Sequence, residues 1–248
     1  MANIEGTAVG RVAETAIYPF KGMQGLKMDE ISLRSVSVAG DRTRAFTITD
    51  SLQTPTFLDT TKFPGLLKYA PSLVSPSDPK NSEVNVRTPG GNNYSADSEE
   101  LLVEVSEVAK KKLAVVRMGR GAYHSMPVSL LSMASIRDIE LTVGHEVDTR
   151  RFRENILVET DSDEPYQENG WLGKIVTFGE RPDSARIAVV KLDPRCATIN
   201  MDPETGKQTP DILRTVVKNR DNNFGIYASI VKEGRVLPGD VVYVSDLE

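Results

Sequence analysis

Short runs of alternating apolar and polar residues dominate the chain, and turn-forming residues bound most of them. Residues 84–87 alternate and stop at a Thr-Pro-Gly-Gly segment, and residues 9–17 mix β-branched with polar side chains before Tyr18 and Pro19. This pattern is typical of half-buried β-strands. It predicts further strands at residues 30–33, 35–39, 44–49, 151–159, 174–178, 185–192, 224–231 and 241–244.

Helical signals are confined to a few segments. Residues 129–140 are predicted to form a helix opened by Pro127, and a second helix is predicted to begin with Thr209 as its N-cap and Pro210 in its first turn. Residues 101–105 fit either a strand or one face of a helix, and both alternatives stay open. The fold class that follows is mainly β with a few helices, rich in β-barrel.

Composition and charge argue against several classes of protein. The 248 residues carry a formal net charge of −5, which argues against a nucleic-acid-binding protein. No apolar run approaches the ~20 residues that span a bilayer. The first residues lack a signal-peptide pattern, so we expect a cytoplasmic protein without a membrane segment. A change of pattern near residue 119 suggests two domains, residues 1–119 and residues 120–248.

The single cysteine, Cys196, is the first candidate for chemistry. One cysteine makes neither an internal disulfide nor a cysteine-based zinc site. One interpretation is a small buried apolar residue. The other is a thiolate favoured by the adjacent Arg195, able to complete the coordination of a metal that arrives inside a sulfur-rich cofactor.

Two sets of cations form the second candidate. Lys21, Arg42 and Arg44 lie at glycine-containing turns beyond predicted strands, where they either bind an anion or are ordinary surface charges. If residues 151–159 form a strand, Arg151, Arg153 and Asn155 share one of its faces, and their side chains offer hydrogen-bond donors to an anion. An exposed strand face is the alternative.

The ordered segments YPFKG, GDR, YHSMPVSLLS, RFRENILVE, RCATINMDPETG and GDVVYV resemble the MOSC family, named after the C-terminal domain of molybdenum cofactor sulfurase. The first half is similar to the β-barrel domain that precedes MOSC in amidoxime-reducing proteins of mitochondria and bacteria. The resemblance implies an N-terminal β-barrel domain packed on a MOSC β-barrel domain, with a cofactor in the cleft between them. The sequence departs from the family at Gly22, at Pro194 and over residues 54–91.

The resemblance also implies the roles of individual residues. Cys196 is expected to ligate the metal of a molybdenum cofactor, a molybdopterin bound to molybdenum. The expected cofactor contacts are Lys21, Arg42, Ser125, Arg153 and Asn155. The protein supplies one thiolate, donors for an anion and a shaped cavity, while the cofactor carries the redox metal and the other sulfur ligands.

The expected function is that of a molybdenum-dependent oxidoreductase that reduces N-hydroxylated, amidoxime-type small molecules. Since the sequence shows no haem or iron–sulfur motif of its own, external electron-transfer proteins are the expected partners beside the small-molecule substrate. The alternatives are a sulfur-carrier or cofactor-binding protein, a divergent MOSC enzyme of a specialised pathway, and a metal-free binding module that kept only the fold.

Overall fold

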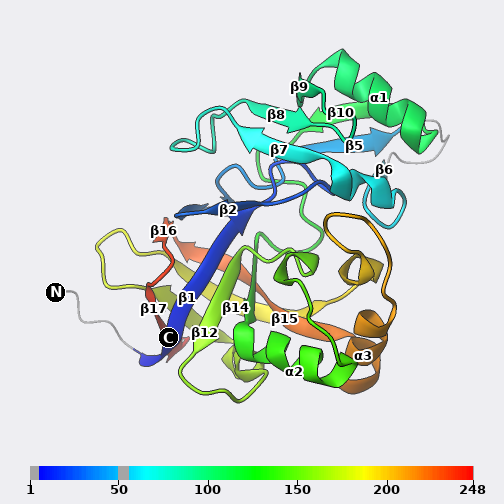
Figure 1. The fold of residues 1–248 in the computed structure, drawn as a ribbon. Helices are drawn as coiled ribbons and strands as arrows, with labels where there is room; N and C mark the ends of the chain where they lie inside the picture. Colours follow the sequence, from blue (N-terminus) through cyan, green and yellow to red (C-terminus); the bar gives the residue numbers. More distant parts are fainter. Residues whose placement is uncertain (1–5, 50–55, 248) are drawn as a thin grey trace.

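The computed structural model describes residues 6–49 and 56–247, and it shows a mainly β protein with three α-helices among those residues (Figure 1). The predicted fold class is therefore confirmed. Thr54 and Pro55, where the departure from the family pattern begins, lie outside the described residues. The helices are α1 (Glu99–Ala109), α2 (Met133–Val143) and α3 (Asp211–Arg220).

Seven strands close into a barrel. Their order is β12-β11-β15-β14-β13-β17-β1, and β1 pairs with β12 to complete the ring. Arg11 lies opposite Glu159 on one side of β1, and Thr7 lies opposite Val244 on the other. The barrel strands are β1 (Thr7–Ile17), β11 (Val128–Ser132), β12 (Ile156–Thr160), β13 (Lys174–Phe178), β14 (Arg186–Pro194), β15 (Asn223–Lys232) and β17 (Val241–Asp246).

The barrel interior is a packed apolar core. Alternate residues of each strand point inward, as Val176 and Phe178 do in β13 and Ile187 and Val189 do in β14. All four are almost fully buried, and they belong to the same apolar cluster as Trp171. Side chains from opposite strands fill a barrel of this size, so the interior leaves the end of the barrel as the place for a ligand.

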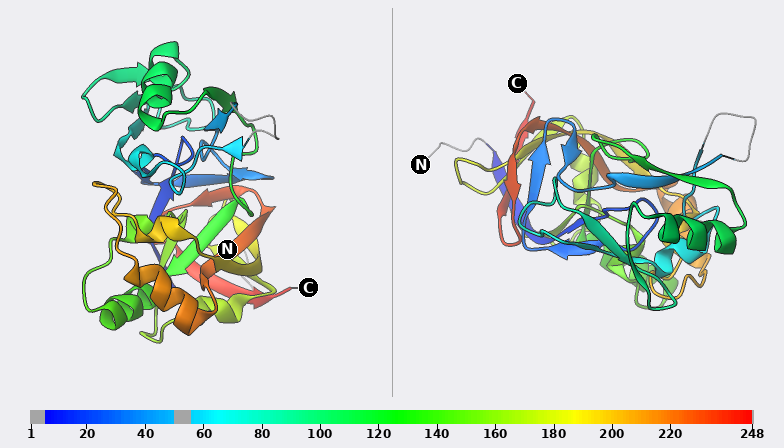
Figure 2. Two further views of the ribbon diagram at one scale, coloured as in Figure 1. Left: turned by 90° about the vertical axis from the view of Figure 1, so that its right-hand side faces the viewer. Right: turned by 90° about the horizontal axis from the view of Figure 1, so that it is seen from above.

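A second, smaller body lies over one end of the barrel (Figure 2). It has its own apolar core around Phe20, Phe46, Tyr69 and Leu101. An N-terminal β-barrel was expected here, but the described residues instead form two open three-stranded sheets and α1 around this core. The first sheet contains β5 (Arg44–Ile48), β6 (Thr56–Phe57) and β10 (Leu113–Arg117), and the second contains β7 (Ala70–Leu73), β8 (Val84–Arg87) and β9 (Asn93–Ser95).

The remaining short strands attach to the barrel. β2 (Leu26–Met28) pairs with the end of β1. A three-stranded sheet joins β3 (Ile31–Arg34), β4 (Ser37–Val38) and β16 (Gly234–Val236). Segments before residue 119 thus contribute strands to the barrel, and the division into residues 1–119 and 120–248 stays a prediction.

The predicted helix at residues 129–140 is wrong in its first part. Val128–Ser132 forms strand β11, whose five residues are all buried, and α2 begins at Met133. A strand buried on both faces shows no alternation, so its sequence resembles the apolar start of a helix. Ser132 ends the strand and caps the helix, because its hydroxyl accepts a hydrogen bond from the Ser135 amide at 3.2 Å.

Two further elements begin later in the chain than predicted. The predicted strand at residues 151–159 begins only at Ile156, because Thr149–Arg151 forms a 3₁₀ turn. The helix predicted from Thr209 begins at Asp211, and its N-cap is Pro210, which has no side-chain cap. The open alternative at residues 101–105 is resolved in favour of helix α1, capped by Ser98.

We expect Gly225→Ala to destabilise the barrel strongly. Gly225, in β15, has a φ of +85°, and an added Cβ would lie 2.8 Å from the Leu130 carbonyl oxygen. The left-handed backbone costs about 1 kcal/mol for alanine, and the overlap costs about 1 to 3 kcal/mol more.

The matched control is Gly91→Ala, because Gly91 has a φ of +88° and nothing within 4 Å of the added Cβ. Denaturant unfolding of both variants separates the two contributions. A loss of stability at Gly225 no larger than at Gly91 would contradict the close approach of β15 to β11.

Candidate functional site

One pocket of about 280 Å³ brings together four of the six predicted site residues. Lys21, Arg42, Arg153 and Cys196 all line it. Residues from both halves of the chain therefore share one cavity, which lies where the smaller body meets the barrel. The other lining residues are Gly22, Asp59, Thr60, His124, Ser129, Arg151, Phe152, Asp193, Pro194, Arg195, Thr198, Ile199 and Tyr227.

Ser125 and Asn155 are not among the lining residues. The neighbour of Ser125, His124, lines the pocket instead. Asn155 is buried, and its side chain joins strands of the barrel: its amide nitrogen donates to the Ala16 carbonyl at 3.2 Å, and its amide oxygen accepts from the Ser129 backbone amide at 3.3 Å. The position of Asn155 is thus explained by the fold.

Backbone carbonyls hold the two most isolated cations in place. Lys21 is only 4% exposed, and its Nζ donates to the Ala122 carbonyl at 2.6 Å. Arg153 donates to the Met23 carbonyl at 2.8 Å. Within the described residues neither cation forms an ion pair with a carboxylate, which leaves their positive charge available to a ligand.

Tyr18 is the surface on which two of the arginines stack. The guanidinium carbons of Arg42 and Arg153 lie 4.9 Å and 4.3 Å from the centre of its ring, and Arg42 also donates to the Arg153 carbonyl at 3.1 Å. Both arginines have positive φ angles, of 48° and 60°. Such angles are uncommon outside glycine and gather at functional sites, where the surrounding structure holds them.

Burial and mutual repulsion shift the titration of these cations. Burial, together with the charges of Arg42 and Arg153, lowers the pKa of Lys21 to about 8. Burial also lowers the pKa of Arg153 to about 10, and Arg42 adds to the effect. Partial burial and the charge of Lys21 lower the pKa of His124 as well. Positive charges crowded in this way favour a bound anion, which would relieve their repulsion.

Cys196 is exposed in this pocket, so the interpretation as a small buried apolar residue is wrong. Its thiol lies 3.3 Å from the Thr198 hydroxyl. Arg195, expected to favour its thiolate, points elsewhere and pairs with Glu154 and Asp193.

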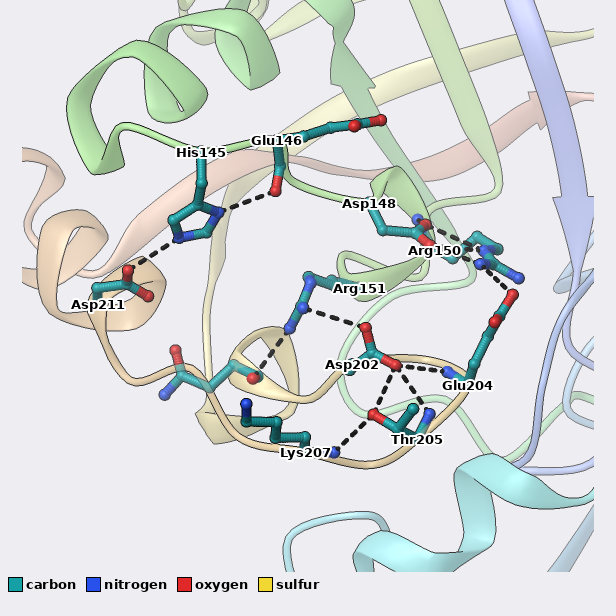
Figure 3. Close-up of polar contacts among 11 residues, drawn as sticks. His145, Glu146, Asp148, Arg150, Arg151, Asp202, Glu204, Thr205, Lys207 and Asp211 are labelled. Carbon is teal, nitrogen blue, oxygen red and sulfur yellow. Dashed lines mark hydrogen bonds and ion pairs between the residues drawn. The ribbon is translucent and has the colours of Figure 1, made fainter.

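The D-P-E-T-G segment, residues 202–206, forms a hydrogen-bonded turn that contacts Arg151 (Figure 3). The Asp202 carboxylate accepts hydrogen bonds from the amide and the hydroxyl of Thr205, both at 2.8 Å. Arg151 donates to the Asn200 carbonyl at 2.9 Å and lies 3.5 Å from Asp202. These contacts fix the turn that leads to Arg153, so the motif acts as a frame for the arginine.

Several pocket residues were not predicted from the sequence. His124 adjoins the predicted contact Ser125 but was not itself predicted. Asp193, Thr198 and Tyr227 were not predicted either, because neither burial nor contacts between segments distant in sequence can be read from a single sequence. Thr198 in particular accepts or donates a 2.7 Å hydrogen bond with Thr60, which joins the loop after Cys196 to the smaller body.

Comparisons with known proteins agree with this architecture. A family model described as the MOSC domain matches residues 114–243. Mitochondrial amidoxime reducing component 2 from Bos taurus is 28% identical over 130 residues, which cover 47% of this chain and 36% of that protein. The chain therefore matches about a third of the length of that curated relative. The crystal structure of the YuaD protein from Bacillus subtilis superposes with a TM-score of 0.52 at 12% identity, covers 97% of each chain and shows a shared fold.

We expect Lys21→Met to remove a pH dependence from the stability of the ligand-free protein. The pKa of Lys21 is about 8 in the folded protein, against a usual 10.5, so folding disfavours the charged amine. This cost is present in full below the folded pKa and is relieved as the pH rises from about 8 to 10.5. Across that window the unfolding temperature of the wild type therefore contains a rising contribution from Lys21.

Lys27→Met is the matched control, because Lys27 is exposed and pairs with Glu14. Thermal unfolding should show the rising contribution in the wild type and the control and a smaller one in Lys21→Met. Identical pH profiles for all three proteins would argue against an uncompensated charge on Lys21.

Proposed function

The chain belongs to the MOSC domain family, and from this premise we propose that its pocket binds a molybdenum cofactor. The reaction we propose is the reduction of N-hydroxylated, amidoxime-type small molecules. The observation that carries the proposal is that one pocket contains an exposed thiol, Cys196, together with the two cations Lys21 and Arg153. Among the described residues neither cation has a carboxylate partner. A thiolate ligand and an anion site are the two elements that a phosphate-bearing molybdenum cofactor requires.

The residues present fit such a group. Arg153 offers a planar guanidinium and Lys21 a compact ammonium, both suited to phosphate, and Arg42 lies beside them on Tyr18. Cys196 is proposed as the metal ligand. The catalytic assignment to Cys196 and the contacts of Ser125 and Asn155 are predictions from the family resemblance. The cofactor would supply a metal that accepts an oxygen atom and exchanges two electrons.

The chain's own groups have a limited set of tasks in this reaction. The cations bind and orient the cofactor, and Tyr18 holds two of them at a fixed spacing. Cleavage of an N–O bond consumes two electrons and two protons and releases water. External electron-transfer proteins are proposed as the source of the electrons, and a proton donor is needed within reach of the departing oxygen.

The curated relative lends support to the substrate class, since its name denotes an amidoxime-reducing protein. The match spans 36% of that relative, so the activity is a proposal for this chain. Among the described residues no helix is long and apolar enough to cross a membrane. The division into a domain at residues 1–119 and a MOSC domain at residues 120–248, with the cofactor between them, is part of the same proposal.

A second candidate function is sulfur or cofactor handling, favoured by the exposure of Cys196. An accessible thiol is able to carry a persulfide without any redox turnover. Trapping of a persulfide on Cys196 in a protein that binds the cofactor and never reduces an amidoxime would support this candidate.

The direct test of the proposed function is anaerobic turnover of benzamidoxime by protein produced in a host that makes the cofactor. With a suitable reductant, molybdenum-loaded protein should yield benzamidine. Loaded protein that yields none would refute the amidoxime-reducing activity.

We expect Cys196→Ser to fold normally and to lose turnover. Serine preserves the size of the side chain but replaces a soft thiolate with a hydroxyl that is a poor ligand for a soft metal. Because Cys196 is exposed, its replacement should change the unfolding temperature little. Unfolding and benzamidine formation are measured on one preparation, and wild-type turnover by loaded variant protein would reject the ligand assignment.

We expect Arg153→Ala to weaken retention of the cofactor. Loss of a charge-assisted contact to a phosphate costs about 1.5 to 3 kcal/mol, a tenfold loss of affinity or more. Arg150→Ala is the matched control, because Arg150 is exposed and pairs with Asp148 and Glu204 (Figure 3). Molybdenum content after gel filtration should fall only for Arg153→Ala, and equal contents would reject its role.

A further inference from the structure

A buried arginine held between two buried carboxylates lies against the pocket. Arg195 pairs with Glu154 and lies 3.0 Å from Asp193. The exposed fractions of these residues are 8%, 3% and 2%. Arg195 also donates to the carbonyls of Phe152 at 3.0 Å and Phe224 at 2.6 Å, so its position is fixed from four sides.

The charges of this triad do not balance when both carboxylates are ionised. One guanidinium cation and two carboxylate anions sum to a net charge of −1 in a site that water barely reaches. A buried net charge is costly, and two carboxylates that share one partner compete for a proton. The geometry therefore favours a state in which one of the two carboxylates is protonated.

Asp193 is the carboxylate that meets the pocket. It lines the cavity, whereas Glu154 does not. Burial, together with the charge of Glu154, raises the pKa of Asp193 to about 7, although Arg195, Tyr227 and Arg42 act in the opposite direction. These four groups are the charged and titratable side chains that act most strongly on Asp193. Burial therefore favours the protonated form of its carboxyl group, next to the space that the substrate would enter.

We propose that Asp193 is the proton donor for the reductive step, an inference that rests on the proposed function. In the reaction the N–O bond of the substrate breaks, and the two electrons come from the external electron-transfer protein. Asp193 gives one proton toward the departing oxygen, and the second proton comes from solvent. The products are the N–H compound and water, and Asp193 regains its proton from solvent through the pocket.

The first test detects the protonated carboxyl group of Asp193 in the cofactor-free protein. Infrared spectra of the cofactor-free protein should contain the carbonyl stretch of a protonated carboxylic acid that disappears as the pH rises through about 7. Asp193→Asn should lack this band. The matched control is Asp59→Asn, at a second pocket carboxylate whose pKa is lowered by hydrogen bonds from Thr61 and Lys62 despite partial burial. The control should keep the band, and a wild-type spectrum without it overturns the proposal.

The second test measures how the protonation of Asp193 changes the stability of the protein with pH. The pKa of Asp193 rises from a usual 3.8 to about 7 on folding, so ionisation in the folded state costs stability as the pH increases between these values. Asparagine resembles the protonated form, so Asp193→Asn should fold and should escape this loss. Its unfolding temperature relative to the wild type should therefore be higher at about pH 8 than at about pH 4. A constant difference overturns the proposal.

The third test uses the loaded protein. The kcat of the wild type should fall as the pH rises through about 7. Asp193→Asn should lower kcat by about a hundredfold or more, with little change in KM, and should lose that pH dependence. Wild-type kcat in the loaded variant overturns the donor role alone. A loaded wild type that never reduces an amidoxime overturns the proposed function and the donor role together, while the infrared band still reports the stored proton.

Discussion

The backbone ladder that joins β1 to both β12 and β17 is the constraint on which the rest of the structure depends. It closes the barrel, and it fixes where the chain leaves β1. The next residues are Tyr18 and Lys21, which thereby lie over the end of the barrel that also presents Cys196. The hydroxyl of Tyr18 donates to the Glu154 carbonyl at 3.2 Å and ties the two halves of the site together. The pocket is thus a consequence of barrel closure.

The pocket contains two kinds of buried cation, and their partners distinguish them. Arg195 is surrounded by Glu154 and Asp193 and has a structural environment rich in negative charge. Lys21 and Arg153 donate to backbone carbonyls, which position them without cancelling their charge. A carbonyl provides a dipole and no net charge, so the free energy of burying these cations is offset only in part. The chain therefore keeps an attraction for anions at one wall and a surplus of carboxylate at another.

Much of the fold was predictable because strands such as β8 and β13 alternate and are bounded by turn residues. β11 was missed because both of its faces are buried and its sequence runs directly into a helix. Residues 152–155 resemble a strand in sequence, yet strand β12 begins only at Ile156. The carbonyls of Phe152 and Arg153 accept hydrogen bonds from arginine side chains, those of Arg195 and Arg42, and not from a strand partner. Lys21 and Arg42 were predicted from cations at turns, Arg153 from a predicted strand face and Cys196 as the single cysteine. The family resemblance joined these four residues into one site. Asp193 was not, since its importance arises from burial beside Glu154, a neighbour that only the folded chain provides.

The pairing of β1 with β17 has a consequence for how the chain folds. β1 begins at Thr7 and β17 ends at Asp246, so the barrel closes only after nearly all of the described chain has been synthesised. Contacts this distant in sequence form slowly. The sheets of the smaller body connect neighbours in sequence, such as β7, β8 and β9, and are able to form earlier. During synthesis β1 has only β2 as a partner, at its end, and lacks its two barrel neighbours. This interval is when the protein is most open to mispairing and aggregation.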